Sequence, residues 1–144
     1  PDKNEELEIM RKNSGSAVSS LNPIITTDDI INARKVLKQV YIDEKIERYI
    51  LDIVFATRNP KEYGLDKLTS LIAYGASPRA SINLAIASKA HAFIKRRGYL
   101  IPEDVRAICH DVLRHRIIVT YEAEAEEITS ENIIDEILNH VEVP

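Results

Sequence analysis

The sequence has 144 residues and a formal net charge of −4 at pH 7, with 44% hydrophobic and 29% charged residues. This composition is typical of a globular domain with a core of its own, and the negative charge disfavours a general nucleic-acid binder. Cys109 is the single cysteine, so an internal disulfide and a cysteine-rich metal site are both excluded and a cytoplasmic location is expected. No apolar run reaches the length of a membrane span.

The first residues predict a charged helix followed by a polar linker. Residues 2–12 place Leu7 and Met10 on one helical stripe, and residues 13–22 are rich in serine. Because the chain begins with Pro1 and not with methionine, we expect it to be a piece of a longer protein.

Capping signals predict two further helices. Thr27 is the predicted N-cap of the first, with Asp28 and Asp29 in its first turn. After a short extended segment, "QVYID", Asp43 is the predicted start of a long helix that ends near Thr57. The apolar face of that long helix is predicted to contain Ile46, Tyr49, Ile50, Ile53 and Val54.

The middle of the chain contains one helix with clear start and stop signals. The stretch "RNPKEYG" interrupts the pattern, and residues 65–73 are predicted to form a loop or a short helix. Ser77 is then a candidate N-cap, Pro78 suits the first helical position, and Gly98 is the predicted end. The buried stripe of this helix is predicted to be Ile82, Ile86, Ala90, Phe93 and Ile94.

The last third predicts two helices and short extended segments. The first helix lies within residues 99–116, with Pro102 near its start and Glu103 and Asp104 in its first turn. "IIVTY" and the closing "VEVP" are candidate short strands, and the acidic "EAEAEE" between them is a predicted solvated loop. Thr129 or Ser130 is expected to cap a final helix. The fold class is therefore all-α, a small helical bundle with at most two or three short strands.

Several reactive side chains are interpreted as structural. His110 and His115 are five residues apart, a poor match to one helix face, so no metal site is expected. Cys109 lies among apolar neighbours and is expected to be a buried thiol. The basic residues near two helix ends have a local electrostatic role, with nucleic-acid contact as the alternative; they are Lys95, Arg96, Arg97, Arg114 and Arg116.

Arg79 is the exception to these local rules. It falls in the first turn of its helix, where the macrodipole is positive and an acid would be preferred. Backbone N–H groups at a helix start attract anions, and a guanidinium beside them suits phosphate oxygens. Two roles are open at this point: Arg79 binds a phosphate, or it forms a salt bridge with a nearby Asp or Glu.

The motifs around Arg79 resemble those of one known family. "ATRNP" at residues 56–60, "GASPRA" at 75–80, "RGYLIPEDV" at 97–105, "VLRHR" at 112–116 and the closing "VEVP" occur in this order. Together they resemble the C-terminal part of MoxR-family AAA+ ATPases, over essentially the whole chain. The resemblance implies that residues 1–22 are the end of the ATPase core with a linker, and that residues 23–144 are the C-terminal helical lid.

The resemblance also implies a function. "GASPRA" is similar to the sensor 2 motif of AAA+ lids, so Arg79 would reach the ATP phosphates and act in catalysis, while Ser77 and Pro78 set the helix start that aims it. The longer protein would use ATP and Mg²⁺, whereas this chain lacks the Gly-x-x-x-x-Gly-Lys-Ser/Thr loop and is expected to bind no cofactor and to be inactive alone.

The implied partners are the protein's own ATPase core, neighbouring subunits of a homo-oligomeric ring, and client proteins with a von Willebrand A domain that need assembly or cofactor insertion. Membrane and nucleic-acid partners are not expected. Two alternatives stay open: the lid of a magnesium-chelatase-like motor subunit, and a free-standing helical interaction or DNA-binding module.

Overall fold

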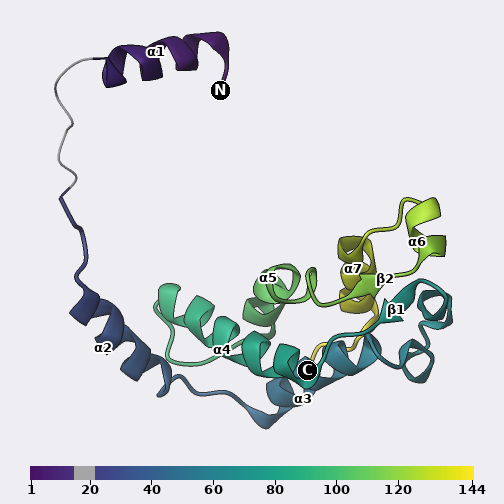
Figure 1. The fold of residues 1–144 in the computed structure, drawn as a ribbon. Helices are drawn as coiled ribbons and strands as arrows, with labels where there is room; N and C mark the ends of the chain where they lie inside the picture. The colour runs from purple at the N-terminus through teal and green to yellow at the C-terminus, as the bar shows by residue number, and fades with distance from the viewer. Residues whose placement is uncertain (15–21) are drawn as a thin grey trace. The chain divides into compact units, whose positions relative to one another are not determined.

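The computed structural model describes residues 1–14 and 22–144, which form two compact units, Pro1–Ala33 and Arg34–Pro144. The elements are helical except for one small two-stranded sheet, which confirms the predicted fold class (Figure 1). In chain order they are α1 (Lys3–Asn13), α2 (Thr27–Leu37), α3 (Glu44–Ala56), the 3₁₀ helices η1 (Pro60–Tyr63) and η2 (Asp66–Thr69), β1 (Ile72–Tyr74), α4 (Pro78–Ile94), α5 (Pro102–Leu113), β2 (Ile118–Val119), α6 (Tyr121–Ala125) and α7 (Ser130–His140).

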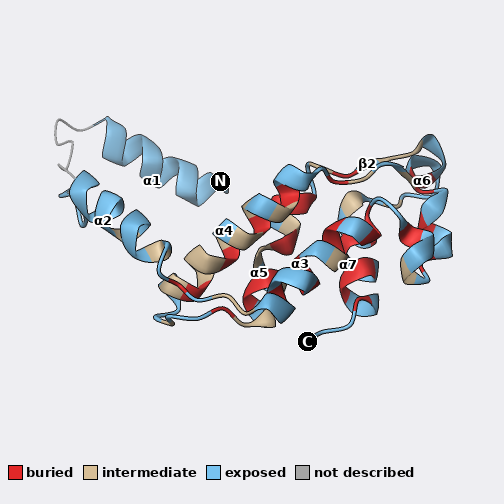
Figure 2. Ribbon diagram, turned by 90° about the horizontal axis from the view of Figure 1, so that it is seen from below, coloured by how far each residue is buried: buried red, intermediate tan, exposed pale blue. Residues whose placement is uncertain are grey.

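Helices α1 and α2 contain no buried residue (Figure 2). Helix α1 begins with a capping box between Asp2 and Glu5. The predicted cap of α2 is wrong by one residue, because Thr26 and not Thr27 exchanges capping hydrogen bonds with Asp29. The predicted linker at 13–22 lies mostly outside the described residues, and the proposed domain boundary after residue 22 stays a prediction.

The core of the second unit is built around helix α3. Asp43 caps it by accepting a hydrogen bond from the backbone N–H of Lys45 at 2.9 Å, as predicted. Its predicted apolar face is buried against α4, α5 and α7 (Figure 2). Each of these large side chains contributes about 1.5–3 kcal/mol by leaving water, so this face holds the bundle together.

Helix α4 buries a different stripe from the predicted one. Ile82 and Ile86 are each 60% exposed, Ile94 is exposed, and Ala90 and Phe93 are only partly buried. The buried residues occur at every fourth position and are mostly small: Ala80, Leu84, Ser88 and Ala92. Small side chains let the backbones of two helices approach closely, and α4 makes its most extensive contact with α5. The bulky isoleucines therefore remain outside.

The predicted end of α4 at Gly98 is also wrong. Arg96 adopts the left-handed conformation at φ 59° that glycine usually provides. The backbone N–H of Arg96 donates to Phe93 O at 2.8 Å, and that of Arg97 donates to Ala92 O at 2.9 Å. These two bonds form a Schellman motif. The motif turns the chain so that Arg97 faces helix α5.

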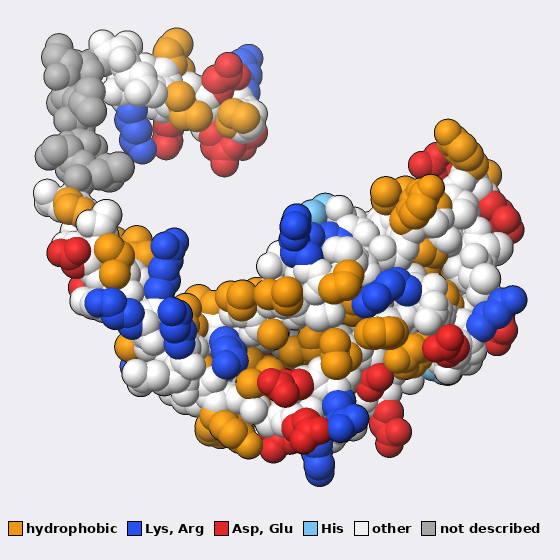
Figure 3. Space-filling view, turned by 60° about the horizontal axis from the view of Figure 1, so that its bottom comes forward, with side chains coloured by type: hydrophobic (Ala, Val, Ile, Leu, Met, Phe, Trp, Pro, Cys, Tyr) orange, Lys and Arg blue, Asp and Glu red, His pale blue; other side chains and the backbone are white. Residues whose placement is uncertain are grey.

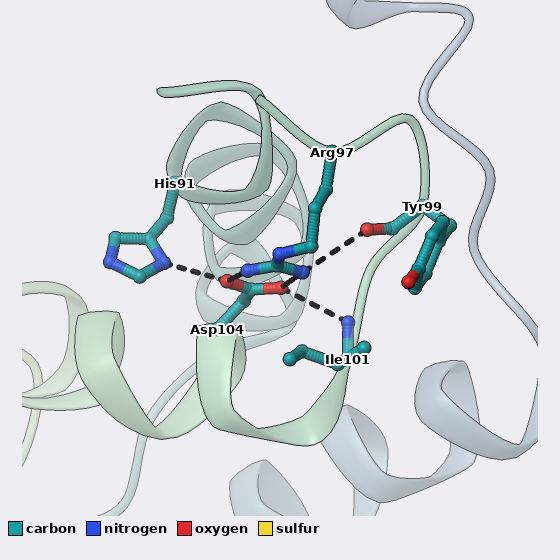
Figure 4. A network of polar contacts seen from close by, with 5 residues as sticks. All are labelled: His91, Arg97, Tyr99, Ile101 and Asp104. Atoms are coloured by element: carbon teal, nitrogen blue, oxygen red, sulfur yellow. Dashed lines mark hydrogen bonds and ion pairs between the residues drawn. The ribbon is translucent and has the colours of Figure 1, made fainter. Parts of the chain in front are cut away.

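Arg97 and His91 converge on Asp104, which is fully buried at the start of α5 (Figure 4). The Arg97 guanidinium donates two hydrogen bonds to the carboxylate, one of them at 2.7 Å. His91 Nδ1 lies 2.7 Å from Oδ1, and the backbone N–H of Ile101 donates to Oδ2 at 3.0 Å. Asp104 lies in the first turn of α5, as predicted. It has a second role as well, because its carboxylate connects the end of α4 to α5.

The C-terminal part corrects two further expectations. β1 and β2 pair antiparallel, which confirms the strand predicted in "IIVTY". The acidic stretch predicted as a loop instead forms most of helix α6, which is capped by Thr120 and buries its residue Ala123. Thr129 caps α7 as expected, but "VEVP" forms no strand.

The Asp104 cluster predicts a specific acid sensitivity. Burial raises the pKa of Asp104, but the hydrogen bonds from Arg97, Ile101 and His91 outweigh burial, so its pKa in the folded chain is below the ordinary value. The cluster therefore stabilises the fold fully above about pH 4, the ordinary aspartate pKa, and less as the pH falls further. Asp104→Asn should lower the free energy of unfolding at pH 7 by roughly 3 kcal/mol.

Urea unfolding at several pH values tests this prediction. The variant should also show a smaller loss of stability below pH 4 than the parent chain does. If the two chains lost equal stability between pH 7 and pH 3, the carboxylate would not be the source of the acid sensitivity.

Candidate anion-binding site at the start of helix α4

Helix α4 begins where the sequence predicts. Ser77 is the N-cap, with extended backbone angles, and Pro78 is the first helical residue. The Ser77 side chain makes no capping hydrogen bond, and Pro78 has no N–H group. Within residues 1–14 and 22–144, no group accepts a hydrogen bond from the backbone N–H of Arg79. The start of α4 therefore has an unused donor at its positive end.

The Arg79 side chain is exposed at this helix start. It forms no ion pair and no hydrogen bond with any part of the chain that the structure describes. The alternative role, a salt bridge with a nearby acid, therefore finds no support here. A guanidinium without a partner beside an unused backbone donor is a suitable arrangement for an external anion.

The segment before Arg79 is held against the end of α3. Thr57, the buried C-cap of α3, donates its hydroxyl hydrogen to Val54 O at 2.7 Å. The same hydroxyl oxygen accepts a hydrogen bond from the backbone N–H of Ala76 at 2.9 Å. Gly75 crosses so close that an added Cβ would lie 2.6 Å from the Thr57 carbonyl carbon. Sequence reasoning missed this contact, although its two halves are the quoted motifs "ATRNP" and "GASPRA".

A second arginine, Arg58, follows the end of α3 and adjoins this segment. The guanidinium of Arg58 stacks over the Phe55 ring, 4.2 Å from its centroid. An added Cβ on Gly75 would lie 2.9 Å from the Arg58 Cα, so the backbone of Arg58 directly adjoins the segment that leads to Arg79. The motif "ATRNP" marks this residue in the sequence, but the motif alone assigns it no role.

An apolar hollow lies along α4. Two of its lining residues, Ile82 and Ile86, share the helical stripe of Arg79, at positions i+3 and i+7, although Arg79 itself does not line the hollow. The hollow has a volume of about 690 Å³, and Figure 3 shows hydrophobic side chains over this part of the unit. Its apolar lining is Leu37, Ile42, Ile82, Ala85 and Ile86, and its charged lining is Arg34, Lys38, Glu47 and Lys89.

The remaining candidates have structural roles. Cys109 is buried, and burial raises its thiol pKa to about 12, so it is a poor nucleophile. His110 pairs with Asp135 at 3.0 Å, and the described residues contain no cluster of three metal-ligating side chains.

The basic group is largely engaged within the chain. Arg97 binds Asp104, Arg114 pairs with Asp111 and Glu131, and Arg116 donates to Val112 O. Lys95 and Arg96 remain exposed.

Comparison with known proteins identifies the helical region. Residues 69–137 match the AAA lid domain family. Over its whole length the chain is 35% identical to "Chaperone MoxR1" of Mycobacterium tuberculosis and 34% identical to an uncharacterised protein, YeaC, of Bacillus subtilis. It is also 34% identical, over 69% of its length, to "Protein MoxR" of Paracoccus denitrificans. Residues 69–137 are an AAA lid domain, in a chain homologous to MoxR-family proteins.

A solved structure agrees with this assignment. The chain superposes on a candidate ATPase from Cytophaga hutchinsonii with a TM-score of 0.89 and 45% identity, over 99% of this chain and 44% of the other. The chain also spans 38% of the mycobacterial relative and 42% of the Bacillus one. The AAA lid match begins before β1 and includes Arg79 and helices α4 to α6. No helix that the structure describes in this chain has the length and hydrophobicity needed to cross a bilayer.

The contact between Gly75 and Thr57 predicts a severe effect of a single methyl group. Gly75→Ala would place a Cβ inside the van der Waals radius of the Thr57 backbone. This overpacking should destabilise the lid by roughly 1–3 kcal/mol or more.

Gly98→Ala is the matched control, because a Cβ at Gly98 meets nothing within 4 Å. This variant should be as stable as the parent or slightly more stable. Thermal unfolding of both variants tests the comparison, and equal melting temperatures would contradict the tight approach of Gly75 to α3.

Proposed function

We propose that this chain serves as the lid of a MoxR-type AAA+ ATPase, with Arg79 as the sensor 2 arginine that contacts the phosphates of ATP. The observation that carries the proposal is the position of Arg79: exposed, without an ionic partner among the described residues, and at the start of α4. The resemblance of "GASPRA" to the sensor 2 motif supports the same role.

The electrostatics of the site favour this role. A cation in the first turn of a helix costs on the order of 0.3–1 kcal/mol against the macrodipole. A phosphate placed between the helix start and the guanidinium would reverse the sign of that interaction. Ser77 and Pro78 define the helix start, and the contact of Gly75 with Thr57 fixes where it lies. Arg79 would thus stabilise the negative charge that develops on the phosphate in the transition state, and the helix start would not have to rearrange to do so.

The apolar hollow supports an ATPase core as the first partner. Because Ile82 and Ile86 are exposed on the Arg79 stripe, a surface that covers them would also face Arg79. In this proposal the core supplies the phosphate-binding loop, Mg²⁺ and the water-activating residues. Nucleotide exchange would then move the lid relative to the core through Arg79.

The wider role follows from the resemblance and from the relative named as a chaperone. The lid would couple ATP binding and hydrolysis to chaperone-like assembly or cofactor insertion in client proteins, in a homo-oligomeric ring in the cytoplasm. Clients with a von Willebrand A domain are the expected class. These steps are proposals, because the chain spans less than half of the relatives it matches.

Arg79→Ala tests the sensor assignment in the full-length ATPase. Removing the cation relieves an unfavourable interaction with the macrodipole, and alanine is a strong helix former. Stability should therefore be unchanged or slightly raised. Turnover should fall roughly ten- to thousand-fold, which corresponds to about 1–4 kcal/mol of lost transition-state stabilisation. Arg79→Lys should recover only part of the activity, because an ammonium lacks the planar fork.

Arg48→Ala is the control, because Arg48 is also an exposed helical arginine and, among the residues that the structure describes, pairs only with Glu44 one turn earlier. Its turnover should match that of the parent. A lower melting temperature with intact hydrolysis in Arg79→Ala would make Arg79 a structural residue and contradict the proposal.

The isolated 144-residue chain should fold but neither bind ATP tightly nor hydrolyse it. Arg79 and one helix start supply only part of a phosphate site, and the sequence contains no Gly-x-x-x-x-Gly-Lys-Ser/Thr loop. Titration calorimetry with Mg·ATP tests this expectation. A micromolar dissociation constant for this chain alone would mean that the lid carries a complete nucleotide site.

A further inference from the structure

A second exposed surface lies on the elements β1, β2 and α6. Tyr74 of β1 is 70% exposed and is the strand partner of Ile118 of β2, which is 58% exposed. Tyr121, the first residue of α6, is 90% exposed. We call these three residues the wing patch. Large apolar and aromatic side chains gathered on adjoining elements are typical of protein interaction surfaces.

Hydrogen bonds hold the elements that carry the wing patch in place. The backbone N–H of Thr120 donates to Leu71 O at 3.0 Å, and its hydroxyl donates to Ser70 O at 2.8 Å. The same hydroxyl caps α6 by accepting from Ala123 N, and Ala123 is buried. Because these contacts already hold α6 on the segment before β1, a partner would not have to order it.

A hollow of about 360 Å³ lies beside the patch. Its only charged lining group is the carboxylate of Glu124, and its other polar side-chain groups are the hydroxyls of Thr120 and Tyr121. The lining residues are Ala73, Ile118, Val119, Thr120, Tyr121 and Glu124. Apolar walls with one anion suit a side chain that has an apolar stem and a cationic head, as arginine and lysine have.

The charges around α6 point to the same chemistry. Glu122, Glu124, Glu126 and Glu127 form no ion pair with any described residue, whereas Glu131 and Asp135 on α7 pair with Arg114 and His110. Residues 117–144 contain eight acidic residues and neither lysine nor arginine. In Figure 3 acidic side chains lie next to hydrophobic ones at the end of the unit that carries α6.

We propose that the wing patch is a docking surface for a protein partner that presents an arginine or lysine beside an apolar side chain. Tyrosine rings bind guanidinium and ammonium groups through cation–π contacts, and tyrosine is enriched among residues that dominate binding energy. The carboxylates of α6, which form no ion pair with any described residue, steer a basic segment to the patch and exclude acidic ones. This surface is separate from Arg79 and does not depend on the proposed sensor function.

The test uses the full chain labelled with ¹⁵N and a defined probe, an acetylated and amidated peptide of four Arg-Leu repeats. The expected result is a saturable set of NMR shift changes centred on Ile118, Tyr121 and Glu124. Tyr121→Ala should weaken binding roughly two- to five-fold, the value of one cation–π contact. Tyr99→Ala, a matched change at another exposed tyrosine, should leave the affinity unchanged.

A second pair of variants separates docking from general attraction between opposite charges. Glu124→Gln and Glu142→Gln each remove one carboxylate from the same acidic stretch, but only Glu124 lines the hollow. Docking requires that Glu124→Gln weakens binding and that Glu142→Gln does not. Equal effects of the two changes, shift changes spread evenly over α6 and α7, or an unchanged affinity in Tyr121→Ala would each overturn the proposal.

Discussion

The close passage of Gly75 over the end of α3 is the contact on which the candidate site depends. It leaves no room for a Cβ at Gly75. The hydroxyl of Thr57 adds two hydrogen bonds, because it donates to Val54 O and accepts from the backbone N–H of Ala76. One buried side chain thus ends α3 and places the start of α4. Since α4 follows within two residues, the position of Arg79 is fixed by backbone geometry and not by contacts of its own side chain.

The two ends of α4 are fixed by different means. Its start is held by close backbone packing, whereas its end is held by charge, through Arg97 and His91 on the buried carboxylate of Asp104. Between these ends the inner face is narrow and made mostly of small residues, so the helix lies close to α5. The outer face keeps its isoleucines in contact with solvent. The same helix therefore provides a core element, a cation at its tip and an apolar outer surface.

Sequence patterns predicted those parts of the fold, chiefly helix starts, that depend on residues close together in the chain. Asp43, Ser77, Pro78 and Thr129 mark helix starts correctly, because capping depends on neighbours within a few residues. The buried face of α3 was also predictable, since most of its large apolar residues lie on one side, with Leu51 and Phe55 as the exposed exceptions.

The buried face of α4 was not predictable in this way. Its apolar residues occur on several sides, and the choice of the small-residue side depends on how closely α5 approaches. Glycine at position 98 suggested a helix end, yet Arg96 takes the left-handed position because the turn also brings Arg97 to Asp104. For the candidate site, the sequence correctly predicted the start of α4, and the role of Arg79 there stays a prediction. The close contact between Gly75 and the backbone of Thr57 joins residues 18 positions apart, and no local sequence pattern reveals such a contact.

The buried thiol of Cys109 gives this chain an internal reporter of core opening. Burial raises the pKa of this thiol to about 12, so the reactive thiolate is scarce at pH 8, and burial also shields the sulfur from reagents. A thiol reagent should therefore label the chain only from states in which α5 has separated from the bundle. Because the sequence has no other cysteine, the labelling rate measures how often the bundle opens. Comparing that rate with and without a bound partner would show whether closing the lid on another domain also tightens the lid itself.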